Sequence, residues 1–470
     1  MRRTGVSGVF RILVAAALPA FPALAQTDAA RAPDLRADVD RLAREVLAST
    51  GVPRASLAIV RDGRIAYAEA YGDARLEPRR PARPGMRYSI GSISKQFTAA
   101  AILMLAEERK LSLDDPVSRF VPALTRGNEV TIRQILSHTS GYQDFWPQDY
   151  VPPFMLREIT AAAILDRWAK MPLDFDPGTQ YQYSNTNYVL AGLIIEKVSG
   201  RPFLEFLRAR IFVPLGMMSV TDIDRGRLAT QDPAGYLRYG LGPPREAPKE
   251  GKGWLFAAGE LAMTAKDLAL WNVSLLERSL LTPASYREME TDVRLKNGLG
   301  TRYGLGVGVT TEAGHRALEH GGEVSGFTAS NAVFPDDRAA ISVLTNQDSA
   351  DAASAILRKI APLLFTKRGS AAASEARARQ VFEGLQQGRI DRSLLTANAV
   401  SYFTDQALKD FASRLGPLGK PEEFKQTSQR DRGGMTFHAF EVKYAKRTLA
   451  IWERDMPDGR IEQFQVLARD

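Results

Sequence analysis

The spacing of apolar residues predicts the first helices and strands of this chain. Segments 56–61 and 64–71 look like strands, and they flank Asp62-Gly63, a dipeptide typical of a β-hairpin turn. The segment YSIGSISKQFTAAAILML, which begins at Tyr88, predicts a helix that is apolar on nearly every side and therefore buried. An amphipathic helix precedes all of these, because four apolar residues repeat at helical spacing: Leu35, Val39, Leu42 and Val46.

The same reasoning predicts further helices at 131–137, 185–198 and 352–364, and a second hairpin. The strands of that hairpin are expected at 331–334 and 339–346. Strands therefore occur early and late, with helices and long loops between them. This order predicts an α+β fold: one antiparallel sheet built from both ends of the segment, flanked by helices, with a helical subdomain inserted in the middle.

Composition changes at 367–374, KRGSAAAS, which is typical of a linker. We therefore expect a main domain over 26–366 and a separate small α+β domain over 375–470. In the small domain the pattern predicts helices before strands, with helices at 376–387 and 406–415 and strands at 436–444, 448–453 and 460–467. This arrangement faintly resembles the cone-shaped domains of the nuclear-transport-factor-like fold.

Residues 1–25 are typical of a secretion signal. Arg2 and Arg3 precede a short apolar stretch at 12–21, and Ala23-Leu24-Ala25 has the small-x-small pattern of a cleavage site. A retained membrane anchor is the alternative, although the apolar stretch is too short to span a bilayer comfortably. We expect a mature chain that starts at Gln26, has no membrane insertion after cleavage, and is periplasmic or secreted.

Composition excludes several classes of protein. The net charge is +8, but 62 basic and 54 acidic residues are interspersed, which indicates a solvated surface and no nucleic-acid partner. The chain has no cysteine, so it has neither disulfides nor a thiol nucleophile. Its four histidines lack metal-binding spacing, so we expect no metal. We also expect no cofactor, because the serine chemistry considered next needs none.

Ser92 and Lys95 lie one turn apart at the start of the buried helix, which suits acyl transfer. Serine is a weak nucleophile until a base removes its proton, and a lysine can do so once desolvation lowers its pKa. The helix N-terminus favours the neutral amine and directs backbone N–H groups toward an oxyanion. Ser-x-x-Lys alone is a common pattern, so an ordinary helix cap with an exposed lysine is the alternative.

Two further motifs favour catalysis. Tyr183-Ser184-Asn185 precedes an apolar helix, and a tyrosine beside a lysine can relay protons; a helix cap with a packed tyrosine is the alternative. His320-Gly321-Gly322 stands just before a predicted strand, where glycines let the backbone approach a ligand. The alternative there is a turn with a surface histidine.

In this order, the three motifs resemble those of the class C β-lactamase and penicillin-binding-protein-like serine hydrolases, over about residues 35–365. Their β-lactamase/transpeptidase-like fold agrees with the predicted sheet. Other stretches that look like this family are LSLDDPVSRFVP, ILSHTSGY, FDPGTQYQYSN, IFVPLGM and GELAMTAKDLALW.

The resemblance implies a role for each motif. Ser92 would be the acylated nucleophile, and Lys95 and Tyr183 would share general base and acid duty. Asn185 would bind substrate or orient Lys95. The backbone N–H groups of Ser92 and Glu323 would form the oxyanion hole.

One departure from the family pattern affects the expected substrate. Class C β-lactamases carry Lys-Thr-Gly where this chain has His320-Gly321-Gly322, a motif that resembles the family VIII esterases and D-aminopeptidases. Without that lysine the site lacks a fixed positive charge for a β-lactam carboxylate. We therefore expect a small ester, amide or D-residue peptide as substrate. A β-lactamase, or a penicillin-binding cell-wall peptidase or sensor with slow deacylation, is the alternative.

The remaining candidates are weaker. His138 in ILSHTSGY is interpreted as a structural residue that closes a helix before a turn. His315 and His438 have no partner motif and are interpreted as surface residues. An aromatic cluster after the His-Thr-Ser-Gly turn either lines the mouth of a pocket or packs within a loop: Tyr142, Phe145 and Trp146.

Overall fold

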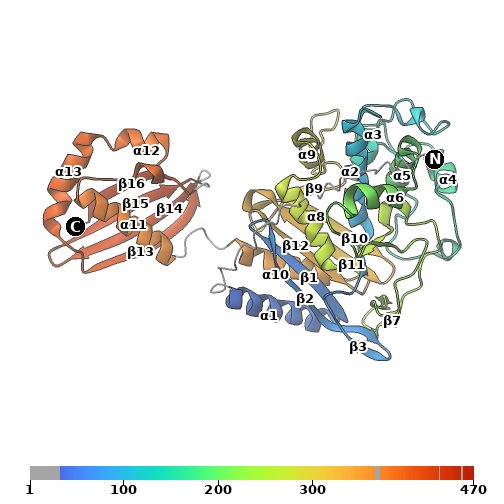
Figure 1. Ribbon diagram of the computed structural model, residues 1–470, viewed down its shortest axis with the longest axis horizontal. Coiled ribbons are helices and arrows are strands. Elements are labelled where there is room, and N and C mark those ends of the chain that lie inside the picture. The colour runs from blue at the N-terminus through green and yellow to red at the C-terminus, as the bar shows by residue number, and fades with distance from the viewer. Residues whose placement is uncertain (1–31, 366–370, 433–434, 457–458, 470) are drawn as a thin grey trace, which may run out of the picture.

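The computed structural model describes residues 32–365, 371–432, 435–456 and 459–469 (Figure 1). The predicted signal at 1–25 lies outside the described residues, and so do positions 367–370 of the predicted linker. Positions 371–374 belong to the first helix of the C-terminal region, α11 (Ala371–Gln386).

A seven-stranded antiparallel sheet forms the centre of the main region, with the strand order β3-β2-β1-β12-β11-β10-β9. Three strands come from the beginning of the main region and four from its end. Pairing of β1 with β12 joins the two groups. The predicted sheet built from both ends of the segment is thus confirmed. Its strands are β1 (Arg54–Arg61), β2 (Arg64–Leu76), β3 (Arg79–Pro81), β9 (Gly308–Glu312), β10 (His315–Val324), β11 (Phe327–Phe334) and β12 (Ala339–Thr345).

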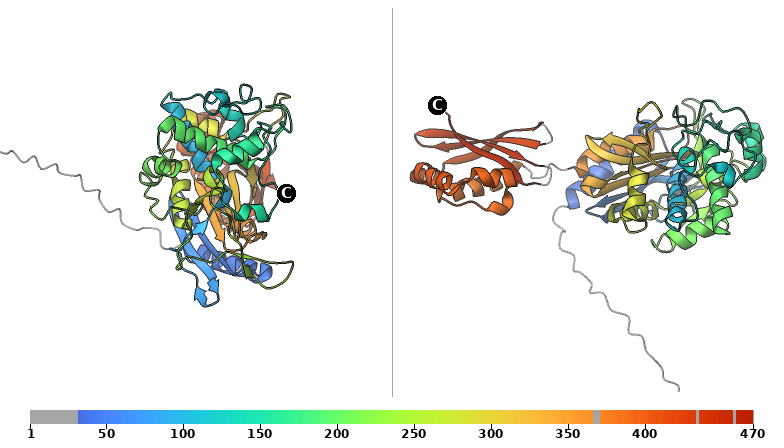
Figure 2. Two further views of the ribbon diagram at one scale, coloured as in Figure 1. Left: turned by 90° about the vertical axis from the view of Figure 1, so that its right-hand side faces the viewer. Right: turned by 90° about the horizontal axis from the view of Figure 1, so that it is seen from above.

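Each face of this sheet is covered by helices, so the sheet separates two apolar cores. In β1, Leu57 and Ile59 enter one core while Ala58 and Val60 enter the other, as the two-residue period of a strand requires. Helices α1 (Ala32–Thr50) and α10 (Ala352–Leu364) pack on one face. Helices α8 (Ala265–Glu277) and α2 (Ser94–Glu107) belong to the other core (Figures 1 and 2).

The residues between the two groups of strands form a mostly helical insertion around α2 (Figure 2). Besides α2 and α8, its α-helices are α3 (Ile132–Leu136), α4 (Ala161–Ile164), α5 (Asn185–Ser199), α6 (Phe203–Leu207), α7 (Phe256–Gly259) and α9 (Pro283–Glu290). Its short strands are β4 (Tyr88–Ser89), β5 (Thr221–Asp222), β6 (Tyr236–Leu237), β7 (Arg245–Glu246) and β8 (Leu261–Met263). As predicted, α2 is buried on nearly every side.

The C-terminal region has its own apolar core, between three helices and a four-stranded antiparallel sheet in sequence order. Strand β13 escaped prediction because only Phe424 among its described side chains is buried, so its polar sequence shows no alternation. The likeness to the nuclear-transport-factor cone stays a prediction. The elements that follow α11 are α12 (Ala397–Tyr402), α13 (Asp405–Leu415), β13 (Glu423–Arg432), β14 (Met435–Tyr444), β15 (Arg447–Asp455) and β16 (Ile461–Arg469).

Within the described residues, no helix combines the length and the apolar composition needed to cross a membrane.

Candidate active site

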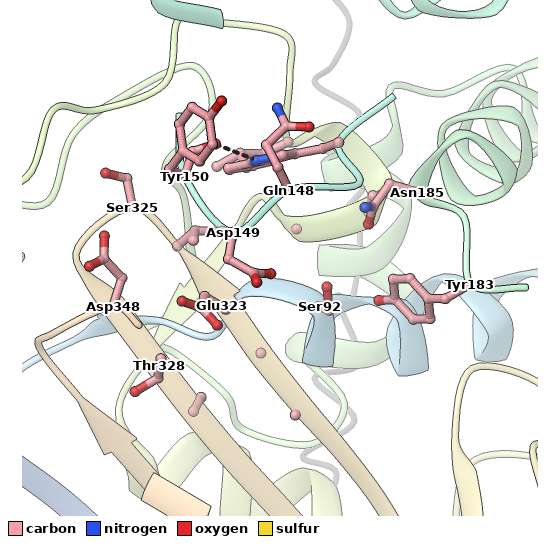
Figure 3. Close-up of a pocket in the computed structure, with 18 of the residues that line it drawn as sticks. Ser92, Gln148, Asp149, Tyr150, Tyr183, Asn185, Glu323, Ser325, Thr328 and Asp348 are labelled. Carbon is pink, nitrogen blue, oxygen red and sulfur yellow. Dashed lines mark hydrogen bonds between the residues drawn. The ribbon is translucent and has the colours of Figure 1, made fainter. Parts of the chain in front are cut away.

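Ser92 lies in η1 (Gly91–Ile93), a single 3₁₀ turn that immediately precedes α2. The α-helix begins two residues later than Ser92, so the serine stands just outside the helix whose first turn carries Lys95. The Ser92 side chain lines a pocket of about 700 Å³. Figure 3 shows it on the floor of this pocket, with the hydroxyl of Tyr183 directed toward it.

Lys95 is fully buried behind Ser92 and contacts only neutral acceptors. Its Nζ lies 2.8 Å from Ser92 Oγ, 2.8 Å from Asn185 Oδ1 and 2.9 Å from the carbonyl oxygen of Ala258. Desolvation lowers the pKa of Lys95 to about 7, although the charge of Asp144 acts in the opposite direction. A large fraction of this lysine is therefore neutral near physiological pH.

Asp144 fixes the orientation of Asn185, and sequence reasoning missed it. Its Oδ1 accepts a hydrogen bond from the backbone N–H of Asn185 at 2.9 Å, and its Oδ2 accepts one from Asn185 Nδ2 at 3.3 Å. The side-chain oxygen of Asn185 must then face Lys95. The only sign of Asp144 in the sequence is its position shortly after the His-Thr-Ser-Gly turn. Nothing in the sequence connects it to Asn185.

Tyr183 is held above Lys95 by aromatic packing. Lys95 Nζ lies 5.0 Å from the centroid of the Tyr183 ring, and the ring of His138 packs 4.2 Å from it, centroid to centroid. Burial raises the pKa of Tyr183, and a hydrogen bond with Ser92 only partly opposes this shift. The residue is therefore a neutral phenol at physiological pH, a proton donor or relay and not a resting phenolate.

His138 is a structural residue, as predicted. It is fully buried, and its Nδ1 accepts a hydrogen bond from the backbone N–H of Ser184 at 3.2 Å. Its backbone carbonyl accepts a second one from Gln182 at 3.0 Å. These bonds anchor the segment that carries Tyr183, and burial holds the pKa of His138 well below its usual range.

The third motif stands before strand β11, as predicted, but it lies inside a strand of its own, so the alternative of a turn with a surface histidine is wrong. Positions 320–322 belong to β10 and pair with Asn331, Ser330 and Ala329 of β11. The glycine at 322 serves protein packing, because a Cβ atom there would lie 1.9 Å from the carbonyl oxygen of Ile90. Gly321 and Gly322 both line the pocket.

His320 is neutral, and both of its ring nitrogens are hydrogen-bonded to protein groups. It therefore cannot serve as a cation that binds an anionic group of the substrate. Burial lowers its pKa to about 4. Its Nδ1 lies 2.6 Å from the carbonyl oxygen of Gly321 and must donate, so its Nε2 accepts from the hydroxyl of Tyr303 at 2.8 Å. Tyr303 is a second residue that sequence reasoning missed.

Glu323 presents its backbone toward the serine turn. A Cβ atom on Gly91 would lie 2.7 Å from Glu323 N and 3.0 Å from Glu323 O, so the backbone of Glu323 lies against η1. A second oxyanion donor would have to lie in this position, close to Ser92. The carboxylate of Glu323 also lines the pocket, where its Oε1 accepts a hydrogen bond from the backbone N–H of Ser349 at 2.7 Å.

Of the three aromatic residues after the His-Thr-Ser-Gly turn, two line the pocket and one packs inside the protein. Phe145 and Trp146 line the pocket. Tyr142 is a packing residue, since it is buried and its hydroxyl donates to the carbonyl oxygen of Thr125. Trp254 also lines the pocket, packs 5.8 Å from the ring of Phe145, and was not foreseen.

The two remaining histidines are not simple surface residues. His315 is partly buried, stacks on Phe365 and lies 2.8 Å from Asp337. The surface assignment of His438 is wrong, because β14 turns that side chain into the C-terminal core. With Glu453 and Asp455 it forms the one group of side chains, among the described residues, arranged closely enough to hold a cation. Both carboxylates already contact the guanidinium of Arg377.

A buried lysine hydrogen-bonded to a serine, at the edge of an antiparallel sheet, defines a serine hydrolase site of the Ser-x-x-Lys type. The chain belongs to the Beta-lactamase family, which matches residues 39–363. Similar curated proteins are Protein flp of Staphylococcus aureus, 27% identical over 67% of this chain, and Penicillin-binding protein 4* of Bacillus subtilis, 28% identical over 64% of it. The aligned part spans 64% of Protein flp and 70% of the Bacillus protein.

Solved structures agree with this fold. A D-stereospecific amidohydrolase from Streptomyces has a TM-score of 0.61 and 29% identity, covering 72% of this chain and 100% of its own. An octameric penicillin-binding protein homologue from Pyrococcus abyssi has a TM-score of 0.62 and 22% identity, covering 92% of this chain and 98% of its own. A D-amino acid amidase from Ochrobactrum anthropi has a TM-score of 0.62 and 24% identity, covering 71% of this chain and 100% of its own.

Proposed function

We propose that this protein hydrolyses an ester or amide bond through an acyl-enzyme on Ser92. The observation that carries the proposal is the position of Lys95, whose Nζ lies 2.8 Å from Ser92 Oγ in a site that lowers its pKa to about 7. A buried amine that is neutral in a substantial fraction of molecules near physiological pH is a general base suited to activating a serine.

The hydrogen bonds of Lys95 direct its lone pair. A neutral amine has two hydrogens, and both Asn185 Oδ1 and the Ala258 carbonyl can only accept. Lys95 donates to these two groups, so its lone pair faces Ser92 Oγ. The Ser92 hydroxyl then donates its proton to Lys95 as Oγ forms a bond to the carbonyl carbon of the substrate.

Collapse of the tetrahedral intermediate breaks the bond to the leaving group. The negative charge on the carbonyl oxygen is stabilised by the backbone N–H groups of Ser92 and Glu323. Tyr183, a neutral phenol, gives its proton to the departing oxygen or nitrogen and recovers one from the protonated Lys95. Water attacks the acyl-enzyme by the reverse sequence, which releases the acid and restores the Ser92 hydroxyl.

The pocket favours substrates other than β-lactams. Neutral His320 stands where the class C enzymes carry a lysine, and both of its ring nitrogens are hydrogen-bonded to protein groups. The similar Streptomyces protein, at 29% identity, is a D-stereospecific amidohydrolase, which supports small esters, amides or D-residue peptides as substrates here. Export to the periplasm or beyond, proposed from residues 1–25, gives access to such molecules.

The test is hydrolysis of p-nitrophenyl butyrate by the purified mature chain beside its Ser92→Ala variant, with nitrocefin as a parallel substrate. We expect ester turnover that falls by at least about a thousandfold in the variant, with little cleavage of nitrocefin. Ser94→Ala, which alters the neighbouring buried serine and leaves Ser92 in place, is the matched control. Full turnover in Ser92→Ala would remove Ser92 as the nucleophile.

A slow-deacylating penicillin binder is the second candidate, favoured by the similarity to Penicillin-binding protein 4*. This function predicts a stable mass increase on Ser92 after incubation with a β-lactam, without turnover of the ester. Fast nitrocefin cleavage would instead indicate a β-lactamase and contradict the role assigned here to the His-Gly-Gly motif.

A further inference from the structure

Two β-hairpins lie side by side at one end of the main region. In the first, β2 turns back into β3, and in the second, β6 turns back into β7 across residues 238–244. The backbone N–H of Ala234 donates to the carbonyl oxygen of Ala74, and the N–H of Leu76 donates to the hydroxyl of Tyr236 at 2.8 Å. Figure 1 shows β3 and β7 at the same end of the main region. The turns of the two hairpins therefore belong to one surface.

The turn of the second hairpin exposes two large apolar side chains. Leu241 is fully exposed and Tyr239 is 75% exposed, and no other large hydrophobic residue that the structure describes is as exposed as Leu241. A single exposed leucine is ordinary on a protein surface. A tyrosine and a leucine two positions apart in one turn form an apolar tip that the fold leaves uncovered, which is typical of a surface that binds a partner.

Arginines dominate the same two hairpins. Residues 75–83 and 236–246 contain six arginines against two glutamates. Four of these arginines are exposed: Arg79, Arg80, Arg83 and Arg245. Of the four, only Arg79 has a carboxylate at ion-pair distance among the described residues, that of Asp73 at 3.0 Å. The surface that carries the apolar tip is therefore positively charged.

An apolar tip beside unpaired arginines fits the surface of an anionic lipid bilayer. Tyrosine and leucine side chains enter the boundary between headgroups and acyl chains, while arginines at the level of the headgroups attract anionic lipids. A second copy of this surface is a poor partner, because a symmetric contact would place arginines against arginines. A nucleic acid would satisfy the arginines, but it would leave Leu241 in water.

We propose that the turns of these two hairpins bind an anionic lipid bilayer, with Tyr239 and Leu241 in the headgroup region and the exposed arginines against the headgroups. The base of the second hairpin contacts the catalytic pocket, because the backbone N–H of the pocket residue Asp348 donates to the carbonyl oxygen of Tyr236 at 3.0 Å. A protein bound in this way holds its pocket close to the membrane surface. The inference is independent of the reaction at Ser92, since its test measures binding and not hydrolysis.

The test is cosedimentation of purified residues 26–470, which lack the apolar stretch at 12–21, with lipid vesicles. One set of vesicles contains phosphatidylglycerol and phosphatidylcholine in equal amounts, and the other contains phosphatidylcholine alone. We expect a partition coefficient at least about tenfold higher for the anionic vesicles, and a fall in binding as salt is raised and screens the arginines. Equal partition into both sets would overturn the inference. Absence of sedimentation with either would overturn it in favour of an acidic protein partner.

A first variant tests the apolar tip. Tyr239→Ser combined with Leu241→Ser should lower partition into the anionic vesicles by at least about tenfold, because two apolar side chains no longer leave water. Leu299→Ser combined with Tyr402→Ser is the matched control, since it removes the same residue types from exposed positions elsewhere, which are 64% and 55% exposed. Binding that the first variant retains in full would overturn the inference.

A second variant tests the charge, and it replaces three arginines of the first hairpin: Arg79→Gln, Arg80→Gln and Arg83→Gln. It should bring the ratio of partition into anionic and neutral vesicles close to one. Its matched control removes the same charge from exposed arginines elsewhere: Arg201→Gln, Arg287→Gln and Arg430→Gln. An equal loss in this control would show a general attraction by the net charge of +8 and would overturn the inference. Thermal unfolding checks that every variant is folded.

Discussion

Two cations, the fully buried Lys95 in the pocket and the partly buried Arg377 in the C-terminal region, have opposite surroundings. Lys95 touches only neutral oxygens, and within the described residues no carboxylate lies at ion-pair distance from it. Arg377 contacts the carboxylates of both Glu453 and Asp455. The pKa of Lys95 therefore falls, while the pKa of Arg377 rises and that of Glu453 is raised above its usual range.

The comparison teaches what burial does to a charge. Without a counter-charge, desolvation makes the neutral form of the lysine accessible and creates a base. With two counter-charges, the arginine stays ionised and connects α11 to strand β15. In the proposed mechanism the first arrangement supplies the base, whereas the second holds a helix on a sheet.

The largest expected effect is a loss of activity on substitution of Lys95, with little change in the stability of the protein. Lys95→Met should lower kcat/KM for p-nitrophenyl butyrate by roughly 10³-fold or more, because Ser92 loses its base. The free energy of unfolding should change by less than about 1 kcal/mol, because relief of desolvation offsets the lost hydrogen bonds. Lys266→Met, at an exposed lysine of α8, is the control for both measurements. Retention of a tenth of the activity would contradict the assignment of Lys95.

The same substitution at Arg377 should have the reverse outcome. Arg377→Met leaves Glu453 and Asp455 buried without their cation, which should cost about 3 kcal/mol in the stability of the C-terminal region. This cost is measured by urea unfolding, with hydrogen exchange of the backbone amides in β14 and β15 as the readout. The control is Arg430→Met, which replaces an exposed arginine of β13. A loss below about 1 kcal/mol would mean that the cluster contributes little to holding α11.

The smallest effect concerns the pH dependence of the rate. Neutral Lys95 is the active form, so kcat/KM should rise with pH, about tenfold per unit below the pKa, and level off above about 7. The charge of Asp144 raises the pKa of Lys95, so Asp144→Asn should move the midpoint to lower pH. Asp336→Asn, which alters an exposed carboxylate outside the pocket, should leave the midpoint in place. A pH-independent rate between pH 5 and pH 9 would exclude a titrating lysine as the base.

Much of the fold could be predicted from local pattern. The hairpin around Asp62-Gly63, the hairpin of 331–334 and 339–346, the buried helix α2 and the sheet formed from both ends of the main region all followed from apolar spacing and turn residues. Strands β10 and β13 did not. The first contains two glycines and the second exposes almost every described side chain, so neither displays the alternation that marks a strand.

The candidate site was predictable in its motifs but not in its connections. Ser92, Lys95, Tyr183 and Asn185 were found from their residue types and order in the sequence. Asp144, Tyr303 and Trp254 were missed, because their roles depend on neighbours far away in the chain. His438 was misjudged for the same reason, since only the pairing of β13, β14 and β15 turns it inward.

The sequence by itself determined the chemical groups, their order and the secondary structure that carries them, because these depend on residues a few positions apart. Only the tertiary structure decided what those groups can do. The pKa of Lys95 falls, as the proposed base requires, because Asn185 and Ala258, 90 and 163 positions away, enclose it without supplying a negative charge. Desolvation and counter-charge are set by packing in space, so the pKa of a buried group is a property of the folded protein.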